Sequence, residues 1–142
     1  MTANTIGIVS LQGLILDDMW FPFLVSGTID PILSLKLAVS LDTTAPNTVK
    51  LAAPGDRILG RLEVIEQRSV EGVTIGTVSV AFCDVLVTDG VHTFVVGDTA
   101  VGGSVAGQVA PLGGGTPAPD HSQNIVLQVL TGGNPVVLKA GS

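Results

Sequence analysis

The sequence predicts an all-β protein, a small antiparallel β-barrel or sandwich of short strands and hairpins with an extended N-terminal arm. Eighteen Gly and eight Pro, with 46% hydrophobic and 13% charged residues, are typical of many short strands and turns. Residues 51–82 add a hairpin pattern, with extended runs over 57–68 and 73–82 and turn residues at 54–56 and 69–72. At 142 residues the chain fits one domain, and a single cysteine, Cys83, excludes an internal disulfide framework.

Residues 1–27 form the predicted N-terminal arm, and residues 28–142 form the single β domain. The arm follows neither a strand nor a helix period, and three of the five aromatic residues lie in it as Trp20, Phe21 and Phe23. Pro22 excludes an ordinary helix through this cluster. Two interpretations stay open: the aromatic rings fill the core of the domain, or the arm anchors a neighbouring subunit.

Residues 34–41 predict a half-buried strand. Its apolar side carries Leu35, Leu37, Val39 and Leu41, and its other side carries Ser34, Lys36, Ala38 and Ser40. Residues 42–47 are rich in turn formers and predict a loop, after which residues 48–51 return to extended chain.

The first arm of the central hairpin alternates between a buried and a wet face. The predicted buried face carries Ile58, Gly60, Leu62 and Val64. The predicted wet face carries Arg57, Arg61, Glu63 and Gln67, with Leu59 and Ile65 intruding on it. The hairpin contains no cluster of catalytic residues, so it is interpreted as scaffold.

A second hairpin is predicted at Asp89-Gly90, which is a strong two-residue turn signal between extended runs. The register pairs Thr88 with Val91, Val87 with His92, Val85 with Phe94 and Cys83 with Val96. Cys83 and His92 then share a face but lie ~13 Å apart along it, too far for a thiolate pair.

The rest of the chain is predicted as short extended pieces between turns. Gly97-Asp98 turns the chain, residues up to Pro111 form short extended segments, and residues 112–123 form a flexible surface loop. The last unit is a strand over 125–130, a turn over 131–135 and a short strand over 136–139.

Charge and hydropathy exclude two classes of partner. The net charge is −6 and the six basic residues are scattered, so no nucleic-acid partner is expected. The longest nearly apolar span, residues 6–16, is too short for a membrane helix, and the N-terminus lacks the basic region of a secretion signal. We expect no membrane partner and synthesis in the cytoplasm.

The residues that could carry chemistry are few, and no catalytic, cofactor-binding or metal-binding residue is predicted. His92 is expected to be a partly buried histidine on the hairpin face, and Cys83 a small buried apolar residue. Asp120-His121 is expected to be a solvated pair, and Asp17-Asp18 lacks the spacing of a calcium loop. Residues 113–115 are three glycines without the lysine of a phosphate loop.

About half of the chain, from Ala38 to about Pro111, resembles tailed-bacteriophage capsid decoration proteins, also called cement or head-stabilising proteins. The resemblance is carried by the run AVSLDTTAPNTVKLAAPGDRILGRLEVIEQRSVEGVTIGTVSV and, later, by VVGDTAVGGSVAGQVAP. It implies a small β domain on the outer surface of a phage capsid in the virion, bridging subunits of the major capsid protein, often as a symmetric cluster. The resemblance brings no catalytic motif, so no enzymatic activity is expected.

The leading hypothesis is therefore a structural accessory of a phage head. Its predicted partner-binding residues are Trp20, Phe21 and Phe23, and the excess of apolar residues favours a homo-oligomer, with a trimer expected and a dimer as the alternative. The alternative function is a carbohydrate or cell-surface binding module of a phage fibre or tail, although one Trp and no Tyr leave little to stack on sugars. An enzyme on a β-barrel is the third hypothesis.

Overall fold

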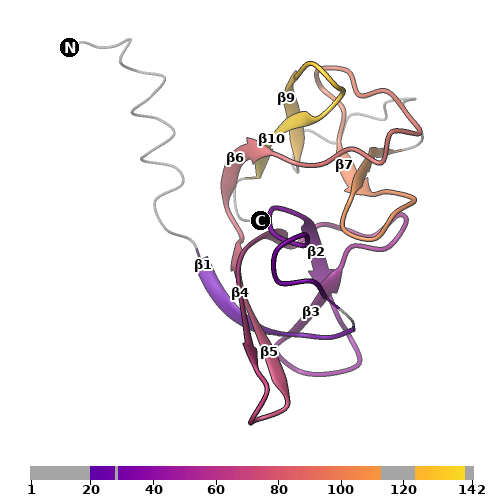
Figure 1. Ribbon diagram of the computed structural model, residues 1–142. Coiled ribbons are helices and arrows are strands. Elements are labelled where there is room, and N and C mark those ends of the chain that lie inside the picture. The colour runs from indigo at the N-terminus through magenta and orange to yellow at the C-terminus, as the bar shows by residue number, and fades with distance from the viewer. Residues whose placement is uncertain (1–19, 28, 113–123, 140–142) are drawn as a thin grey trace, which may run out of the picture.

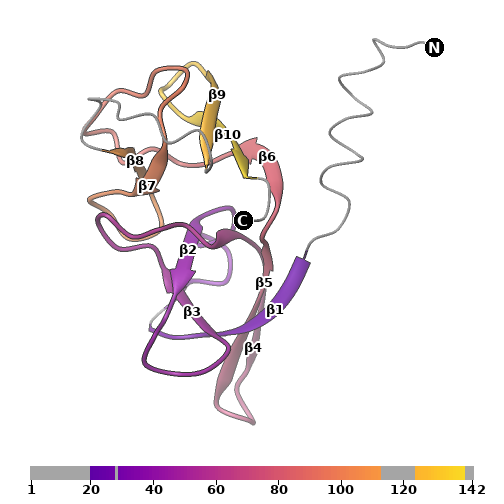
Figure 2. The ribbon, with the colours of Figure 1, turned by 180° about the vertical axis from the view of Figure 1, so that it is seen from behind.

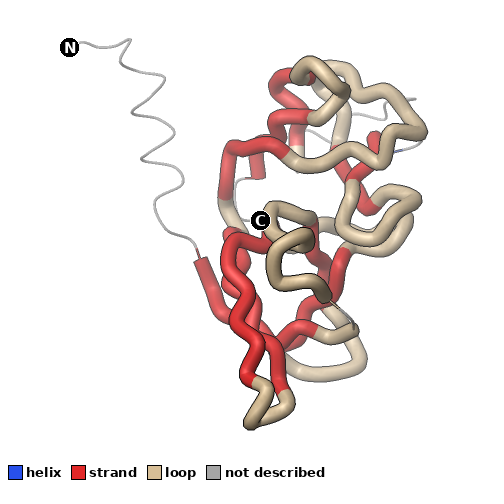
Figure 3. Tube along the Cα trace, viewed as in Figure 1, coloured by secondary structure: helices blue, strands red, loops and turns tan. Residues whose placement is uncertain are grey.

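The computed structural model describes residues 20–27, 29–112 and 124–139, and this part of the chain is all-β, as predicted. Figure 3 shows strands joined by turns and loops throughout it. The strands are β1 (Trp20–Val25), β2 (Ala38–Leu41), β3 (Thr48–Leu51), β4 (Gly60–Arg68), β5 (Val73–Ser79), β6 (Phe82–Val85), β7 (Ala100–Gly102), β8 (Val109–Pro111), β9 (Ile125–Val129) and β10 (Pro135–Lys139).

The first five strands form a closed barrel in the order β1-β3-β2-β4-β5. It occupies the lower half of the molecule in Figure 1. The barrel closes because β1 pairs antiparallel with β5 along one edge and parallel with β3 at its end. Closure covers most of the strand edges that an open sheet would expose, and among the described strands the first residues of β1 keep one edge unpaired. For this part of the chain, the structure decides between barrel and sandwich in favour of the barrel.

Strands β6 to β10 form a second unit above the barrel, which is seen from both sides in Figures 1 and 2. It contains a three-stranded sheet in the order β6-β10-β9 and a two-stranded sheet of β7 and β8. The hairpin of β9 and β10 was predicted from the sequence and is confirmed, with a bulge between Val136 and Val137.

Each unit has its own hydrophobic core. The barrel core contains the buried residues Ile29, Val39, Val49, Leu62 and Val78. The core of the second unit contains Ala38, Ala52, Ile58, Phe82, Leu86, Phe94, Ala100, Val109, Val126 and Val137. Ala38, Ala52 and Ile58 belong to the chain of the barrel, so its upper end packs directly on the second unit.

The strand predicted over residues 34–41 is shorter in the structure, because residues 31–36 form a turn. The Asp30 carboxylate accepts hydrogen bonds from the backbone N–H groups of Ile32 and Leu33, both at 2.8 Å, and these bonds favour the turn. Lys36 has a φ of 70°, which a strand does not allow. The remaining strand, β2, is buried on both faces from Ala38 to Ser40 because it lies between the two cores, whereas Leu41, predicted on the apolar side, is 51% exposed.

Three of the four residues predicted on the buried face, Ile58, Gly60 and Leu62, are buried. The fourth, Val64, lies on the exposed side of β4. Leu62 pairs with Val78 and Val64 pairs with Thr77, so Glu63 is an extra residue in a β-bulge. The bulge turns Val64 outward and lets Ile65 pack against the barrel core. It therefore explains why Ile65 interrupts the polar alternation in the sequence.

The hairpin predicted at Asp89-Gly90 is wrong. The turn exists, with Gly90 at a φ of 76°, but the residues on its two sides do not pair. Strand β6 pairs with β10 instead, and Val87 and Asp89 bond to the backbone of Val109. The Asp89 carboxylate accepts hydrogen bonds from the backbone N–H and the hydroxyl of Ser104, which holds the turn against a distant loop.

Three predicted segments fall partly or wholly outside the described residues. The arm over residues 1–27 is described only from Trp20, and Trp20–Val25 is a barrel strand, so the proposed boundary after residue 27 does not separate this strand from the domain. Residues 1–19 lie outside the described part. The loop over 112–123 is described only at Leu112, and the pair Asp120-His121 is not described.

Candidate functional site

Strand β1 places the three aromatic residues predicted to bind a partner in different environments. Alternation turns Trp20, Pro22 and Leu24 to the outside of the barrel and Phe23 to the inside. Phe23 packs against the barrel core, whereas Trp20 and Phe21 are 49% and 47% exposed. Each of the two interpretations of the aromatic cluster thus fits part of it: Phe23 lies against the core, and Trp20 and Phe21 are accessible.

Pro22 fits into β1 because of the pairing around it. It lies opposite Thr77 of β5, while β3 pairs only with Leu24 and Val25. Pro22 therefore lies beside no described strand on its second edge, and a residue without an N–H group is tolerated there.

The outward residues of β1 continue across two neighbouring strands. Pro22 lies opposite Thr77 and Leu24 opposite Ile75, and on the other side of β5 Thr77 lies opposite Val64. Residues opposite each other in an antiparallel pair share a face of the sheet. We call this outward surface the β1 face, and it consists of Trp20, Pro22, Leu24, Val64, Ile75 and Thr77.

The β1 face contains large apolar side chains that are open to solvent. Trp20, Leu24 and Val64 are each exposed by two fifths or more. None of its six residues carries a charge, but the exposed Glu66 lies opposite Ile75 on β4 and borders the face with a carboxylate. An exposed apolar patch of this kind marks a contact surface more often than a catalytic site.

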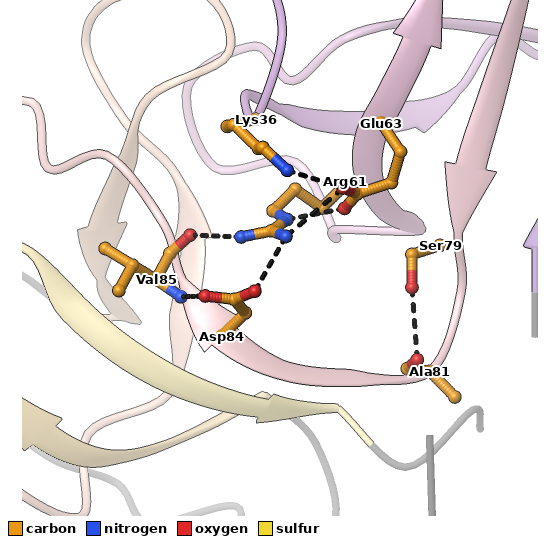
Figure 4. Close-up of polar contacts among 7 residues, drawn as sticks. All are labelled: Lys36, Arg61, Glu63, Ser79, Ala81, Asp84 and Val85. Atoms are coloured by element: carbon orange, nitrogen blue, oxygen red, sulfur yellow. Dashed lines mark hydrogen bonds and ion pairs between the residues drawn. The ribbon is translucent and has the colours of Figure 1, made fainter. Parts of the chain in front are cut away.

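An ion cluster centred on the buried side chain of Arg61 borders this face (Figure 4). The Arg61 guanidinium donates hydrogen bonds to Glu63 at 2.6 Å, to Asp84 at 2.8 Å and to the carbonyl oxygen of Val85 at 3.1 Å. Lys36 donates to the same Glu63 carboxylate at 2.9 Å. Because Arg61 and Glu63 are on β4 of the barrel while Asp84 and Val85 are on β6, the cluster joins the two units.

The sequence placed Arg61 and Glu63 on a wet face, and that prediction is wrong. Their side chains are only 8% and 5% exposed. Burial by itself lowers the pKa of Arg61, but the hydrogen bonds and charges of Glu63 and Asp84 outweigh burial and raise it. The signal in the sequence was the spacing Arg61-x-Glu63, which puts opposite charges on the same side of a strand.

A cavity of about 190 Å³ lies between the β1 face and this cluster. It is lined by Trp20, Arg61, Glu63, Phe82, Cys83 and Asp84, among others. Cys83 is half-buried, and burial, with the charge of Asp84, raises the pKa of its thiol. The thiol therefore stays protonated at neutral pH, which does not suit a nucleophile.

The residues singled out for chemistry do not converge in the described part of the chain. His92 was expected on a partly buried hairpin face, and it is exposed because that hairpin does not form. Among the described residues no group of three His, Cys, Asp or Glu side chains is placed to hold a metal ion. No helix within the same residues is long and apolar enough to cross a membrane. Residues 17, 18, 113–115, 120 and 121 lie outside them.

Comparisons of this chain with protein families, with curated proteins and with solved structures find no match. The described residues therefore define only a broad class. It is an all-β protein with a closed barrel, an exposed apolar face and an ion cluster between two units.

Proposed function

We propose that the protein is a capsid decoration protein, which binds the outer surface of a phage head and stabilises it by bridging subunits of the major capsid protein. The β1 face is the observation that supports this proposal best. It presents Trp20 and Leu24 from a closed barrel, so the apolar side chains are held in place before binding. A preorganised face loses little conformational entropy when it docks. The proposal assigns no reaction to the protein.

The β1 face suits a contact with a large partner. A stable interface between proteins buries about 1,000 Å² or more, and each Å² of apolar area removed from water contributes about 25 cal/mol. Trp is among the residues that dominate such interfaces. Trp20 is therefore the residue of this face with the largest expected contribution to binding.

A bridging protein also needs a second contact, and the second unit offers one. Val91, Val95 and Val96 lie in the loop between β6 and β7, and each is more than half exposed. This loop belongs to the upper half of the molecule, whereas β1 belongs to the lower half (Figure 1). Apolar side chains on both units fit a protein that touches two neighbouring subunits.

Self-association is part of the proposal. Local three-fold points are natural positions for a clamp on a shell, so a trimer is proposed and a dimer is the alternative. Light scattering of the free protein and of the protein released from shells measures this directly. A monomer in both samples contradicts the clustered form of the proposal.

Binding to purified, undecorated phage shells tests the proposed function. Trp20→Ala and Leu24→Ser should each weaken binding at least about tenfold, because each removes apolar contact area from the β1 face. Leu41→Ser is the matched control, since Leu41 is similarly exposed on β2, outside the β1 face and outside the loop between β6 and β7. Unchanged binding of both β1 variants, at unchanged thermal stability, would refute the β1 face as the attachment surface.

The arm needs a separate variant, because Trp20–Val25 is part of the barrel. Removing residues 1–19 keeps β1 in place, whereas removing residues 1–27 would also delete a barrel strand. If removal of residues 1–19 by itself abolishes shell binding, attachment is assigned to these nineteen residues rather than to the β1 face.

A carbohydrate-binding module remains the second candidate, supported by the cavity beside Trp20. A half-exposed indole next to Asp84 and Glu63 combines a stacking surface with hydrogen-bond acceptors. A glycan array separates the two candidates. A reproducible hit that Trp20→Ala abolishes favours the sugar, and an array without hits leaves the capsid proposal.

A further inference from the structure

The cavity of about 190 Å³ beside Trp20 lies across three strands of the barrel. Trp20 of β1 lies opposite Ser79 of β5, and Ser79 lies opposite Arg61 of β4. Residues opposite each other in antiparallel pairs share a face of the sheet, so these three form a row. Neighbouring strands are about 4.8 Å apart, which puts the backbones of Trp20 and Arg61 about 10 Å from each other. The cavity therefore lies over Ser79, with an indole on one side and the ion cluster on the other.

The start of β6 closes a third side of this cavity. Phe82, Cys83 and Asp84 all line it. An oxygen of the Asp84 carboxylate lies 2.8 Å from a guanidinium nitrogen of Arg61 (Figure 4). Trp20 is 49% exposed and the Asp84 side chain is 51% exposed. Solvent therefore reaches the cavity between an aromatic ring and a carboxylate.

The charges that line the cavity do not balance. They are one cation, Arg61, and two carboxylates, Glu63 and Asp84, which gives a net charge of −1. Arg61 donates two hydrogen bonds to Glu63, at 2.6 and 3.2 Å, and both side chains are buried. Lys36 also contacts Glu63, but its side chain is 58% exposed and does not line the cavity. The excess negative charge is therefore presented by the half-exposed Asp84.

Asp84 keeps hydrogen-bonding capacity for a further donor. One of its oxygens accepts a hydrogen bond from Arg61 at 2.8 Å, and the other accepts one from the backbone N–H of Val85 at 2.7 Å. A carboxylate has about four acceptor sites, so each oxygen retains one that no described residue uses. The charge of Asp84 also acts inside the cavity, where burial first, and then Asp84, raise the pKa of the Cys83 thiol. A positively charged donor is therefore favoured here over an anion.

Trp20 supplies an aromatic face for the same ligand. A cation within about 6 Å of the centre of an aromatic ring is attracted by the electrons of the ring, and Trp attracts it most strongly. One such contact exists beside the cavity, because the Arg61 guanidinium lies 5.9 Å from the centre of the Phe82 ring. Among the described residues, no cation lies over the indole of Trp20. This ring is therefore available to a cation from outside.

The volume of the cavity limits the ligand to the size of one side chain. Pockets for drug-sized ligands measure about 300–1,000 Å³, whereas a cavity of about 150 Å³ holds a benzene molecule. The cavity beside Trp20, at about 190 Å³, is closer to the second. A guanidinium is planar, stacks on aromatic rings and carries several N–H donors in a geometry that fits a carboxylate. An arginine side chain therefore fits the volume, the ring and the charge together.

We propose that this cavity, between Trp20, Arg61 and Asp84, binds an arginine side chain of a partner protein. The bound guanidinium stacks on the indole of Trp20 and donates hydrogen bonds to the Asp84 carboxylate. The net charge of −6 also attracts basic segments at a distance, which increases the rate of encounter. The origin of the arginine in a capsid subunit rests on the proposed function, whereas the site itself does not.

The test uses the whole protein in solution without shells. Acetyl-arginine N-methylamide is titrated while fluorescence follows Trp20, which is the single Trp of the chain, and NMR follows the amide resonances of Ser79 and Cys83. Acetyl-citrulline N-methylamide is the matched probe, because it has nearly the same shape without the charge. We expect saturable, millimolar binding of the arginine probe and at least about tenfold weaker binding of the citrulline probe. Added salt should weaken the binding of the arginine probe, because ions screen its attraction to Asp84.

Two variants and a control test the residues of the site. Asp84→Asn and Trp20→Leu should each weaken binding of the arginine probe at least about fivefold. Trp20→Leu leaves the ion cluster intact, so it keeps the test decisive where Asp84→Asn perturbs the link between the units, and NMR follows it. Glu66→Gln is the matched control and should leave binding unchanged. Glu66 also pairs with an arginine and its side chain is 57% exposed, but it does not line the cavity.

The contrary results refute this site without refuting the proposed function. Equal affinity for the two probes, unchanged affinity in both variants, or no saturable binding of the arginine probe overturns the proposal. Tighter binding of methyl glucoside than of the arginine probe also overturns it, because the cavity would then be a sugar site. Shell binding is measured separately, so its failure refutes the proposed function and leaves the arginine site in place.

Discussion

The barrel and the second unit are held together in different ways. The barrel is a continuous ladder of strand pairs that closes on itself, and its longest pairing joins β4 and β5, which are neighbours in sequence. The second unit has two small sheets and long loops, and its β6 pairs with the distant β10. Its loops are held by side chains: buried Asp98 accepts a hydrogen bond from the backbone N–H of Val95 at 2.8 Å, and Asp89 holds Ser104.

This difference shows where stability and function can be separated in the molecule. The ladder makes the barrel a rigid support for the β1 face, whereas the second unit depends on individual polar contacts and on its attachment to the barrel. Arg61 contributes to that attachment, since it binds Glu63 of the barrel and Asp84 of the second unit, beside the core contacts of Ala38 and Ile58. Variants in each unit and at Arg61 test the comparison.

Core truncations should have the largest effect. Leu62 and Leu86 are fully buried in the barrel core and the second core, so Leu62→Ala and Leu86→Ala should each lower the free energy of unfolding by about 2–5 kcal/mol. Trp20 fluorescence reports on the barrel, and far-UV circular dichroism reports on both units. Coincident transitions in both variants are expected, because the barrel packs on the second unit through Ala38 and Ile58. A Leu86→Ala variant that leaves the Trp20 transition in place would show that the units unfold independently.

Breaking the ion cluster should be nearly as costly. Arg61→Met removes the partner of Glu63, whose side chain is buried, and should lower the free energy of unfolding by about 3 kcal/mol. Chemical denaturation measures this change.

Lys36→Met is the matched control for Arg61→Met, because Lys36 contacts the same carboxylate from an exposed position. It should cost less than about 1 kcal/mol. Equal losses in the two variants would contradict a central role for the guanidinium.

The barrel should also show a defined response to acid through Asp42. The hydrogen bond from the Ser26 hydroxyl, and then those from Thr44, lower the pKa of Asp42 from 3.8 to about 2. Since the folded pKa lies below the unfolded one, Asp42 stabilises the fold above the unfolded pKa, and this stabilisation is lost as the pH falls from about 4 to about 2.

Denaturant midpoints across this pH range should therefore fall less steeply for Asp42→Asn than for the parent protein. In the second unit, burial acts to raise the pKa of Asp89, but hydrogen bonds from Ser104 and Val91 lower it, so Asp89→Asn offers a comparison. Identical acid profiles for Asp42→Asn and the parent protein would exclude this role for Asp42.

The tip of the β4–β5 hairpin should give the smallest effect. Arg68 pairs with Glu66 and Glu71, and all three are exposed, so Arg68→Ala should change the free energy of unfolding by less than about 0.5 kcal/mol. A loss close to that of Arg61→Met would mean that burial does not distinguish the two arginines.

Part of the candidate site could be found from the sequence, and part could not. Trp20, Phe21 and Phe23 were predicted to bind a partner from their concentration of aromatic area; the structure leaves Trp20 and Phe21 exposed and packs Phe23 against the barrel core. Val64, Ile75 and Thr77 were not predicted to share a face with Trp20, because only the bulge at Glu63 and the pairing of β1 with β5 bring those residues together.

Local chemistry in the sequence determined the all-β class, the β4–β5 hairpin, the β9–β10 hairpin and the loop over residues 42–47. Turn residues and alternation act between neighbours along the chain, so they can be recognised without the fold. The tertiary structure alone decided the closure of the barrel by β1, the burial of Arg61 and the pairing of β6 with β10 in place of a hairpin at Asp89-Gly90. These features depend on which distant segments compete for the same strand edge or buried carboxylate, and that competition is settled only when the whole chain packs.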